Sequence, residues 1–292
     1  MKIALYGKPF LNELNKNISP ILEAIKKAGL GLDIYEKYYK FLRSKNLIDE
    51  TYPTFNRKDV SIDQYACLVS VGGDGTLLDT VTIVGDSGVP VVGINAGRLG
   101  FISSISVEEI EPVLKSVVED DFVCDERSLL SLKTRNNLYG DFNYALNELT
   151  VHKKDTASMI KIDAYLDAEF LNSYWADGLI ISSPTGSTAY NMSCGGPIVL
   201  PGSENFVVTP IAPHNLNVRP AVVSNDSEIR LKVEGRSDDY LIALDSRTEI
   251  IRANEEVVIS KAPFSFKLIK PKGHSFISTM RNKLGWGLDK RN

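Results

Sequence analysis

The pattern of apolar residues changes after Asp120 and Asp121, and this change constrains the fold more than any other feature of the sequence. Before it, short apolar runs alternate with segments whose apolar residues recur at helical spacing. The predicted strands are 2–6, 32–35, 66–71 and 89–94, and the predicted helices are 18–28, 107–118 and one that begins at Thr76. Alternating strands and helices are typical of a parallel sheet covered by helices. Residues 1–121 are therefore expected to form a Rossmann-like α/β domain.

Beyond residue 121 almost every predicted segment is a strand. These segments are 129–134, 142–151, 159–174, 178–183, 206–211, 228–234, 240–245, 254–260 and 264–270. Short strands at this spacing are typical of a β-sandwich. We expect a β-rich domain over residues 122–273, and a final helix at 276–286 that returns, with residues 274–292, to the first domain. The length of 292 residues also favours two domains, because single cores usually stop growing near this size.

The helix predicted at 107–118 carries two conflicting signals. Ser106 and Glu109 stand at the spacing of a capping box, which favours a helix that begins at once. Pro112 would remove a backbone hydrogen bond inside that helix. We therefore expect either a kink or a later helix start.

Charge and cysteine content exclude several kinds of partner. The formal net charge is −4, so the chain has no positive field that would collect a nucleic-acid backbone. Cys67, Cys124 and Cys194 are far apart in the sequence and form no Cys-x-x-Cys pair, which indicates reduced thiols. No apolar run reaches the roughly 18 residues of a membrane helix, and the first residues lack the pattern of a signal peptide. We expect a cytoplasmic protein without nucleic-acid or membrane partners.

The sharpest local feature is the sequence GGDGT at 72–76, which stands between the apolar strand 67–71 and a predicted helix. Glycines at such a turn let backbone N–H groups point at a phosphate, and the helix N-terminus adds partial positive charge. The residues expected to bind phosphate here are Gly72, Gly73, Gly75 and Thr76. A Rossmann fingerprint would need glycine where Leu78 stands, and a Walker A motif would need Gly-Lys-Ser/Thr, so neither motif fits.

Asp74 is the unusual member of this loop. A carboxylate beside phosphate oxygens is repulsive unless a metal ion intervenes or the carboxylate takes part in proton transfer. Its presence therefore favours catalysis. The alternative is that Asp74 only caps the following helix, and for an isolated GGDG sequence the two interpretations have about equal weight.

Two further loops combine small and polar residues in a way that favours ligand binding. The loop PTGSTAY at 184–190 can admit a ligand closely and donate hydrogen bonds to it, although it could also be an ordinary helix cap. Asn147 and Glu148 interrupt a strand-like stretch. Because adjacent strand residues point to opposite faces, they can serve one ligand only at a bulge or a strand end. The alternative is one solvated and one internally bonded residue, and Asp177 is equally ambiguous.

Taken together and in this order, these segments resemble the NAD kinase family. The segments that carry the resemblance are GGDGTLL at 72–78, INAGRLGF at 94–101, ALNE at 145–148, DGLIISSPTGSTAYNMSCGGPI at 177–198 and TPIAPHNLNVRP at 209–220. The segment 177–198 is the most specific of them. The resemblance implies an N-terminal α/β domain, a C-terminal β-rich domain and a substrate in the crevice between them.

The resemblance also implies a reaction. A phosphoryl group would pass from ATP or polyphosphate to the adenosine ribose 2′-hydroxyl of NAD, with Asp74 as the acceptor of the hydroxyl proton. The implied contacts with NAD are Asp74, Gly75, Asn147, Glu148, Asp177, Thr188, Ala189, Tyr190, Asn191, Met192, Ser193 and Ala212. A divalent cation, Mg²⁺, is implied on the donor phosphates rather than in a protein-only metal site. The implied assembly is a homodimer or homotetramer.

Two residues depart from the pattern of the family. Trp175 stands where some members carry Arg, and Arg247 stands where some carry Gln. Both flank the expected NAD site, so Arg247 is included among the candidate binding residues. The two departures bear on substrate contact and on the preference between NAD and NADH. For Trp175 the alternative is a packing aromatic, which is the commoner role.

Two other functions stay open at this point. Lipid and sugar kinases share a similar GGDG loop, but segment 177–198 resembles NAD kinases, and no membrane-docking patch is evident in the sequence. The other alternative is a dinucleotide sensor that has lost catalysis. Asp74 argues against it, because a pure binder would gain by replacing a carboxylate that repels phosphate.

Overall fold

The structure is a computed structural model that describes residues 1–9, 18–57, 61–95, 100–154, 159–253 and 255–286. The chain divides into two compact units. Unit 1 comprises Met1–Glu126 and Phe266–Asn292, and unit 2 comprises Arg127–Ser265. The boundaries differ from the predicted ones, because residues 122–126 and 266–273 belong to unit 1. The ion pair between Asp125 and Lys270 joins these two stretches within unit 1.

Unit 1 contains a parallel sheet. Its strands are β1 (Lys2–Gly7), β2 (Gly31–Tyr35), β3 (Thr54–Phe55), β4 (Leu68–Val71) and β5 (Val91–Ile94). They lie in the order β5-β4-β1-β2-β3, and every neighbouring pair is parallel. The end of β17 adds a further parallel neighbour to β5 through Leu268 and Val91. This topology is that of the predicted Rossmann-like domain.

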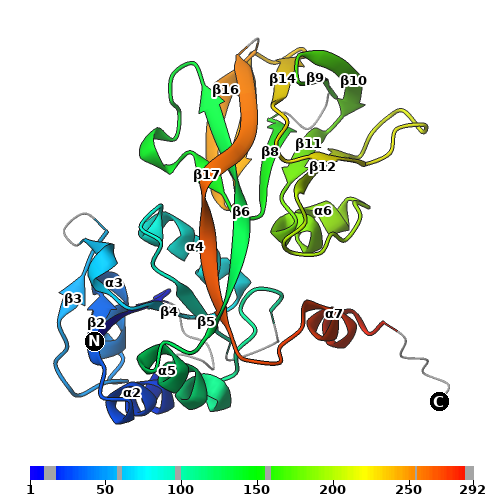
Figure 1. Cartoon of the computed structure of the whole chain (residues 1–292). Helices are drawn as coiled ribbons and strands as arrows, with labels where there is room; N and C mark the ends of the chain where they lie inside the picture. The colour runs from blue at the N-terminus through cyan, green and yellow to red at the C-terminus, as the bar shows by residue number, and fades with distance from the viewer. Residues whose placement is uncertain (10–17, 58–60, 96–99, 155–158, 254, 287–292) are drawn as a thin grey trace. The chain divides into compact units, whose positions relative to one another are not determined.

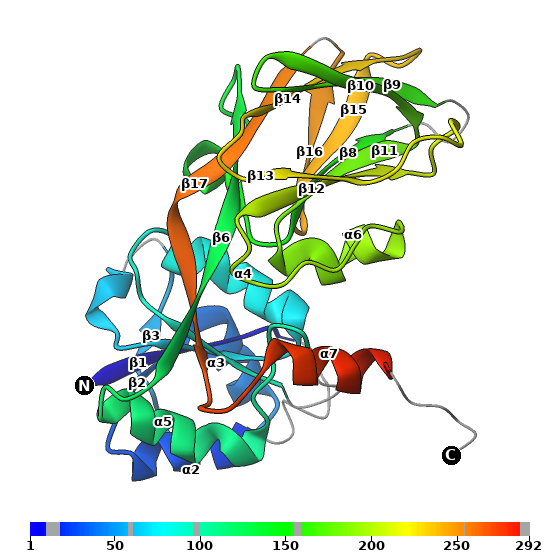
Figure 2. The same cartoon turned by 45° about the vertical axis from the view of Figure 1, so that its right-hand side comes forward.

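Unit 1 also contains helices. They are α2 (Ile18–Lys27), α3 (Glu36–Ser44), α4 (Asp74–Val84), α5 (Ile110–Val118) and α7 (Phe276–Leu284), with short 3₁₀ helices η1 (Ile62–Gln64) and η2 (Val107–Glu109). Helices α2 and α5 lie side by side (Figures 1 and 2). Helix α3 was not predicted. Its buried Tyr38 and Leu42 stand at helical i, i+4 spacing, which is the signal that could have found it.

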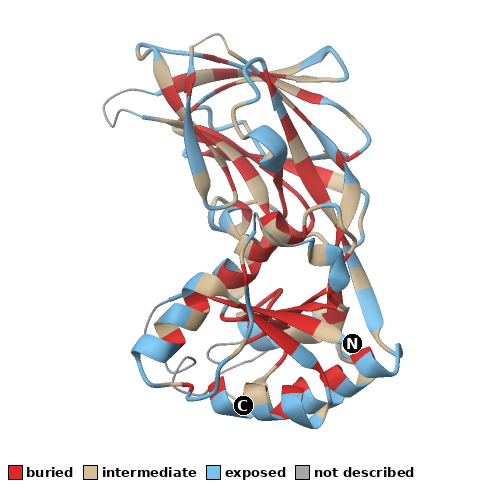
Figure 3. Cartoon of the chain, turned by 90° about the vertical axis from the view of Figure 1, so that its left-hand side faces the viewer, coloured by how far each residue is buried: buried red, intermediate tan, exposed pale blue. Residues whose placement is uncertain are grey.

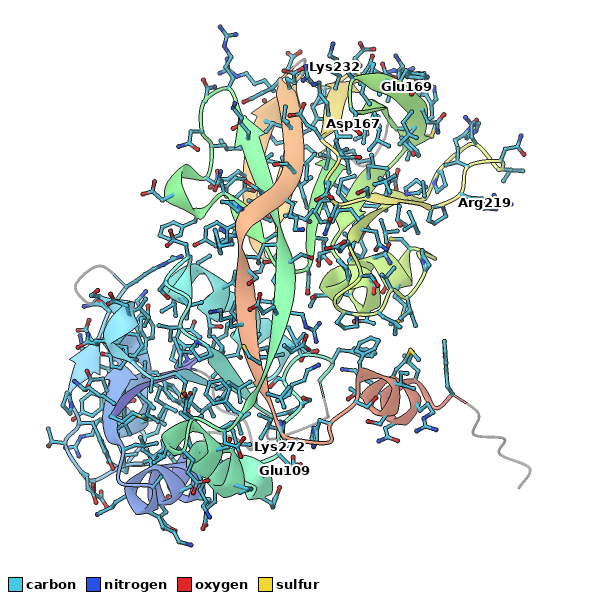
Figure 4. All side chains as sticks on the ribbon, in the orientation of Figure 1. Glu109, Asp167, Glu169, Arg219, Lys232 and Lys272 are labelled. Carbon is cyan, nitrogen blue, oxygen red and sulfur yellow. The ribbon has the colours of Figure 1, made fainter. Side chains whose placement is uncertain are left out.

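The conflict between the capping box and Pro112 is resolved by a later start of the α-helix. The capping box of Ser106 and Glu109 is present, but it caps the 3₁₀ turn η2, and α5 begins at Ile110. Glu109 is labelled in Figure 4. Pro112 is therefore the third residue of α5, where the missing N–H would have no partner within the helix.

Unit 2 is built almost entirely of strands. They are β6 (Val123–Thr134), β7 (Tyr144–Ala145), β8 (Glu148–Lys153), β9 (Ile160–Leu166), β10 (Glu169–Ala176), β11 (Gly178–Ser182), β12 (Asn205–Ile211), β13 (Ala221–Ser224), β14 (Ile229–Glu234), β15 (Asp239–Leu244), β16 (Arg247–Arg252) and β17 (Glu256–Lys270). The short helices are η3 (Gly140–Phe142), η4 (Thr185–Thr188) and α6 (Tyr190–Ser193). Strands β6 and β17 begin in one unit and end in the other.

The strands of unit 2 form two sheets around one core. One sheet has the antiparallel order β13-β12-β11-β8-β15-β16, and the other contains β10-β9-β14-β17 with β6 and β7. Buried residues of both sheets, such as Val151 of the first and Ile162 of the second, belong to the same hydrophobic cluster. In each unit the buried residues concentrate on the strands (Figure 3). The predicted fold class, an α/β domain followed by a β-sandwich-like domain and a final helix, is confirmed.

Several details of the strand prediction were wrong. The segment predicted at 159–174 is two antiparallel strands, β9 and β10, and the two-residue strand β3 was missed. The segments predicted at 254–260 and 264–270 are one continuous strand, β17. Strands β13 and β16 were missed, because both lie at the edge of their sheet and show little apolar alternation. Within the described part of the chain, no helix is both long and apolar enough to cross a membrane.

Candidate active site

The GGDGT sequence lies where the strand order of the unit 1 sheet reverses. The chain winds from β1 through β2 to β3 on one side and adds β4 and β5 on the other. In open parallel sheets, ligands bind outside the carboxyl ends of the strands at such a switch point. Gly7 ends β1 and Val71 ends β4, so residues 72–76 occupy this position.

The glycines around the loop fall into two groups, which differ in whether a Cβ atom would fit at the position. A Cβ on Gly72 would clash with the side chain of Thr76, and one on Gly100 would clash with the carboxylate of Asp74. Gly73 and Gly75, in contrast, have no atom within 4 Å of a Cβ position among the described residues. No described residue crowds these two positions. The absence of a side chain there therefore leaves room for a ligand close to the backbone.

The carboxylate of Asp74 accepts hydrogen bonds from three consecutive backbone N–H groups. Phe101 donates to Oδ2 at 2.8 Å, and Ile102 and Ser103 donate to Oδ1 at 3.2 and 2.8 Å. The hydroxyl of Ser103 also donates to the carbonyl of Gly72 at 2.8 Å. The segment from Phe101 to Ser103 therefore fixes both the carboxylate and the loop that carries it.

The interpretation of Asp74 as a helix cap is wrong. Gly73 holds the N-cap position of α4, and Asp74 is the first residue of the helix, without a side-chain cap hydrogen bond. Its carboxylate accepts hydrogen bonds from residues 101–103 and none from the N–H groups of its own helix. The predicted segment at 94–101 supplies Phe101 and adjoins Ile102 and Ser103, although its residues 96–99 lie outside the described residues.

Two lysines lie beside the loop. The Nζ of Lys8 donates to the carbonyl of Gly75 at 2.9 Å and pairs with Asp79 Oδ2 at 2.9 Å. The Nζ of Lys283 lies 3.8 Å from Asp74 Oδ2. Neither lysine was predicted, because each is remote from GGDGT in the sequence and stands in no recognisable motif.

In unit 2, two segments that were predicted separately form one cluster. A Cβ on Gly186 would clash with the carbonyl of Asn147, so the loop at 184–188 packs directly on the backbone of residues 146–148. The N–H of Ser183 donates to the carbonyl of Asn147 at 2.9 Å. Asn147 follows β7 and Glu148 begins β8, so the pair stands at a strand end, where both residues can serve one ligand.

Asp245 lies under this cluster and was not predicted. Its carboxylate accepts hydrogen bonds from the N–H groups of Leu146, Asn147 and Glu148 at 2.9, 2.8 and 3.3 Å. Asp245 also has a φ of 51° in the two-residue turn between β15 and β16. Aspartate tolerates this left-handed conformation better than most residues. The signal in the sequence is Asp-Ser between two strand-like segments, which is typical of a tight turn.

Glu148 and Asp245 form a half-buried carboxyl pair. The pKa of Glu148 is raised to about 8, first by burial and then by the charge of Asp245, while a hydrogen bond from the backbone of Tyr190 opposes the shift. Burial also raises the pKa of Asp245, while its three N–H donors favour the ionised form. Asp245 is therefore the charged member of the pair, and Glu148 holds a proton near neutral pH. One carboxylate oxygen of Glu148 is buried without a hydrogen-bond partner.

The residues at 188–193 divide into exposed and buried members. Tyr190 is 40% exposed, Thr188 is buried, Ser193 is exposed, and Ala189 and Met192 are half-buried. Asn191 is fully buried, and its side chain holds the loop together. Its Nδ2 donates to the carbonyls of Ser187 and Pro197 at 3.1 Å each, and its Oδ1 accepts from Thr209 at 2.6 Å.

Four other residues singled out in the sequence lie in unit 2. Two are predicted contacts, and two differ from the pattern of the family. Asp177 forms an ion pair with Lys153 at 2.6 Å. Ala212 is exposed and has a φ of 45°, a conformation that costs about 1–2 kcal/mol for a residue with a Cβ. The guanidinium of Arg247 donates to the carbonyls of Phe142 and Tyr144. Trp175 is 46% exposed, so it is not a core packing residue.

Among the described residues, no group of three or more His, Cys, Asp or Glu side chains is arranged to hold a metal ion. The carboxylate of Asp74 is already engaged by three N–H donors. These side chains fit an ion carried in by phosphate oxygens better than an ion held by the protein alone.

The fold and the two clusters define a phosphotransferase in which a glycine-rich loop carries an aspartate. Two family models match the chain: the ATP-NAD kinase N-terminal domain over residues 34–122 and the ATP-NAD kinase C-terminal domain over residues 146–271. The chain belongs to the NAD kinase family.

Individual relatives agree with this assignment. NAD kinases from Flavobacterium psychrophilum and Bacteroides fragilis are 46% and 38% identical to the chain, and each alignment covers 100% of both proteins. An NAD kinase from Archaeoglobus fulgidus, solved in complex with ATP, has a TM-score of 0.74 at 27% identity and covers 98% of each chain. Yeast NADH kinase complexed with NADH has a TM-score of 0.86 at 22% identity, covers 99% of this chain and 89% of its own, and shows the shared fold.

Proposed function

We propose that this chain is an NAD kinase that transfers a phosphoryl group from ATP to the adenosine ribose 2′-hydroxyl of NAD, with Asp74 as the acceptor of the hydroxyl proton. The observation that carries the proposal is the position of Asp74 in a switch-point loop whose neighbouring glycines leave room for a ligand. Family membership supports the choice of NAD as acceptor. The ATP complex of the Archaeoglobus relative supports ATP as donor.

The hydrogen bonds of Asp74 suit the task of a proton acceptor. A carboxylate offers about four acceptor sites, and three are taken by the N–H groups of residues 101–103. The remaining site can accept the ribose hydroxyl. An aspartate is a weak base for an alcohol, so its task is to orient the hydroxyl and to take the proton late, as the bond to phosphorus forms.

The cluster in unit 2 is the proposed binding site for the adenosine part of NAD. The proposed contacts in unit 2 are Asn147, Glu148, Asp177, Thr188, Ala189, Tyr190, Met192, Ser193 and Ala212. Ribose hydroxyls and the adenine amino group are donors that suit amide and carboxyl oxygens. For Asn191 and Arg247, whose side chains are bonded within unit 2, we propose support of the loops rather than direct contact.

Gly72, Gly73, Gly75 and Thr76 are proposed to face the phosphates of the donor. Mg²⁺ bound to those phosphates would neutralise the charge that develops on them during transfer. The residues of the loop position the reactants, and Asp74 holds the hydroxyl. We further propose a homodimer or homotetramer, on the precedent of the family. A cytoplasmic location is proposed because Cys67, Cys124 and Cys194 are free thiols.

The direct test is the formation of NADP. Purified wild-type protein is incubated with NAD, ATP and Mg²⁺, and NADP is detected with an NADP-specific dehydrogenase. We expect turnover by the wild type and a loss of about 10² or more with Asp74→Asn. The matched control is Asp86→Asn, which makes the same change on an exposed residue just beyond α4 and should keep full activity.

A wild-type protein that binds NAD tightly but forms no NADP with ATP or with polyphosphate would refute the proposal. An Asp74→Asn variant with near wild-type turnover would refute the role of Asp74 alone. Parallel reactions with NADH as acceptor and polyphosphate as donor measure the two preferences.

A further inference from the structure

Lys283 of α7 has no role in the function proposed above, yet it lies at the catalytic loop. Its Nζ is 3.8 Å from Asp74 Oδ2, which is an ion-pair distance but too long for a hydrogen bond. The same Nζ lies 4.6 Å from the ring centroid of Phe101, whose N–H donates to Asp74. The ammonium therefore adjoins both the carboxylate and the segment that orients it.

Helix α7 presents Lys283 on the same face as Phe276 and Met280, which pack within unit 1. Phe276, Met280 and Lys283 stand at i, i+4 and i+7, which places them on one side of the helix. Phe276 packs against Phe101 with ring centroids 6.4 Å apart, and Met280 is buried. Ser275 caps the start of the helix, and Gly285, at a φ of 65°, ends it. The Lys283 side chain, although exposed, contacts Asp74 and Phe101 from this face.

The charge of Asp74 repels phosphate groups at the loop, and the charge of Lys283 can offset this repulsion. Asp74 must remain charged to accept a proton, but its charge repels the phosphates that the neighbouring glycines are placed to receive. The protein as a whole adds no attraction, because its net charge is −4. A cation at 3.8 Å reduces the field of the carboxylate without taking the acceptor site that the hydroxyl needs.

We propose that Lys283 is a positioning residue that offsets the charge of Asp74 and so allows the triphosphate of the donor to approach the loop. This inference rests on the proposed function in one respect, namely that the loop receives a phosphate donor. It adds a role for the C-terminal helix in donor binding.

The test is a double-mutant cycle in donor affinity. The dissociation constant of MgATP is measured by calorimetry for the wild type, Lys283→Met, Asp74→Asn and the double variant, because binding needs no turnover. We expect Lys283→Met to weaken MgATP binding about fivefold in the wild-type background, as suits an ion pair whose side chains are 32% and 30% exposed. Asp74→Asn alone should tighten MgATP binding, and the double variant should bind MgATP within about twofold of the wild type, because the effects of the two charges on the same ligand add and cancel.

A double variant that binds MgATP as weakly as Lys283→Met alone would overturn the proposal, since removal of the Asp74 charge would then not restore what the loss of Lys283 takes away. No loss in either background, or no binding of MgATP by the wild type, would also overturn it. Formation of NADP by the wild type is measured in a separate assay. A failure of the Lys283 proposal can therefore be told apart from a failure of the proposed function.

Three further variants separate charge from packing. Lys283→Arg keeps the charge and should restore most of the affinity. Arg281→Met removes an exposed charge two residues away on the same helix and should leave the affinity unchanged. Phe276→Leu removes the ring pair with Phe101 but keeps the cation. If Phe276→Leu weakened MgATP binding as much as Lys283→Met, the effect would belong to the docking of α7, and the charge proposal would be wrong.

In steady-state kinetics the same logic predicts a selective effect. Lys283→Met should raise the KM for ATP about fivefold and leave the KM for NAD unchanged. A merely structural role would move both constants together.

Discussion

At the scale of single residues, the two clusters use aspartates in the same way. Asp74 and Asp245 each accept three backbone N–H groups, and each thereby fixes a short segment of chain. The difference is in their surroundings. Asp74 lies beside a lysine, whereas Asp245 lies beside the carboxyl group of Glu148. The first arrangement leaves a charged acceptor for a ligand, and the second keeps a proton on its neighbour.

The half-buried carboxyl pair predicts a pH dependence of stability. A glutamate side chain in water has an ordinary pKa of 4.5, whereas the pKa of Glu148 is about 8 in the folded protein. Between these values the folded chain binds more protons than the unfolded chain, so the free energy of unfolding falls as pH rises through this window. Glu148→Gln cannot ionise. Relative to the wild type, its free energy of unfolding should therefore increase from about pH 5 to about pH 8, by roughly 3–4 kcal/mol.

Urea denaturation at several pH values across this window measures the difference. The control is Glu169→Gln, an exposed residue at the start of β10 that is labelled in Figure 4, which should give no pH-dependent difference. A constant difference between Glu148→Gln and the wild type across this range would contradict the assignment of the proton to Glu148.

At the scale of elements, the sequence predicted those segments whose apolar pattern is strong. Strand β4 and the glycine turn after it were predictable, because a buried strand followed by GGDG has few alternative structures. Edge strand β16 was not, because its residues are mostly polar and only the hydrogen bonds to β15 make it a strand. Asp245 and Lys283 were missed for a related reason. Their roles come from contacts with residues remote in the sequence, which no local pattern records.

The start of α5 offers a prediction at this scale. Ser106 and Glu109 form a reciprocal capping box, in which the N–H of Ser106 donates to Glu109 at 2.9 Å. Ser106→Ala removes one half of it and should lower the free energy of unfolding by about 1 kcal/mol. Ser116→Ala, within α5, is the control. Its hydroxyl donates only to the carbonyl of Val113 one turn back, and alanine favours helix, so little or no loss is expected. Equal losses in urea denaturation would contradict the capping role.

At the scale of the whole molecule, the described residues of each unit form a hydrophobic core of their own, and NAD is proposed to be recognised mainly by residues of unit 2. A ligand that binds only the folded state raises the free energy of unfolding. NAD at about one hundred times its Kd should therefore stabilise the protein by about 2.7 kcal/mol.

Thermal denaturation with and without NAD measures this stabilisation. Nicotinamide mononucleotide is the matched control, because it lacks the adenosine that carries the acceptor hydroxyl, and it should stabilise much less. Equal stabilisation by both compounds would contradict the proposed recognition of adenosine.

The passage of the chain through β6 into unit 2 and back through β17 has a consequence for the protein during its synthesis. Unit 2 is one continuous stretch, Arg127–Ser265, whereas unit 1 needs residues from both sides of it. On the ribosome, the strand that pairs with β5 and the helix that carries Lys283 emerge only after all of unit 2. Domains generally fold as units while the chain is made. We therefore expect the nascent chain to complete its β-sandwich first, and to acquire phosphotransferase activity only after its last helix has been translated.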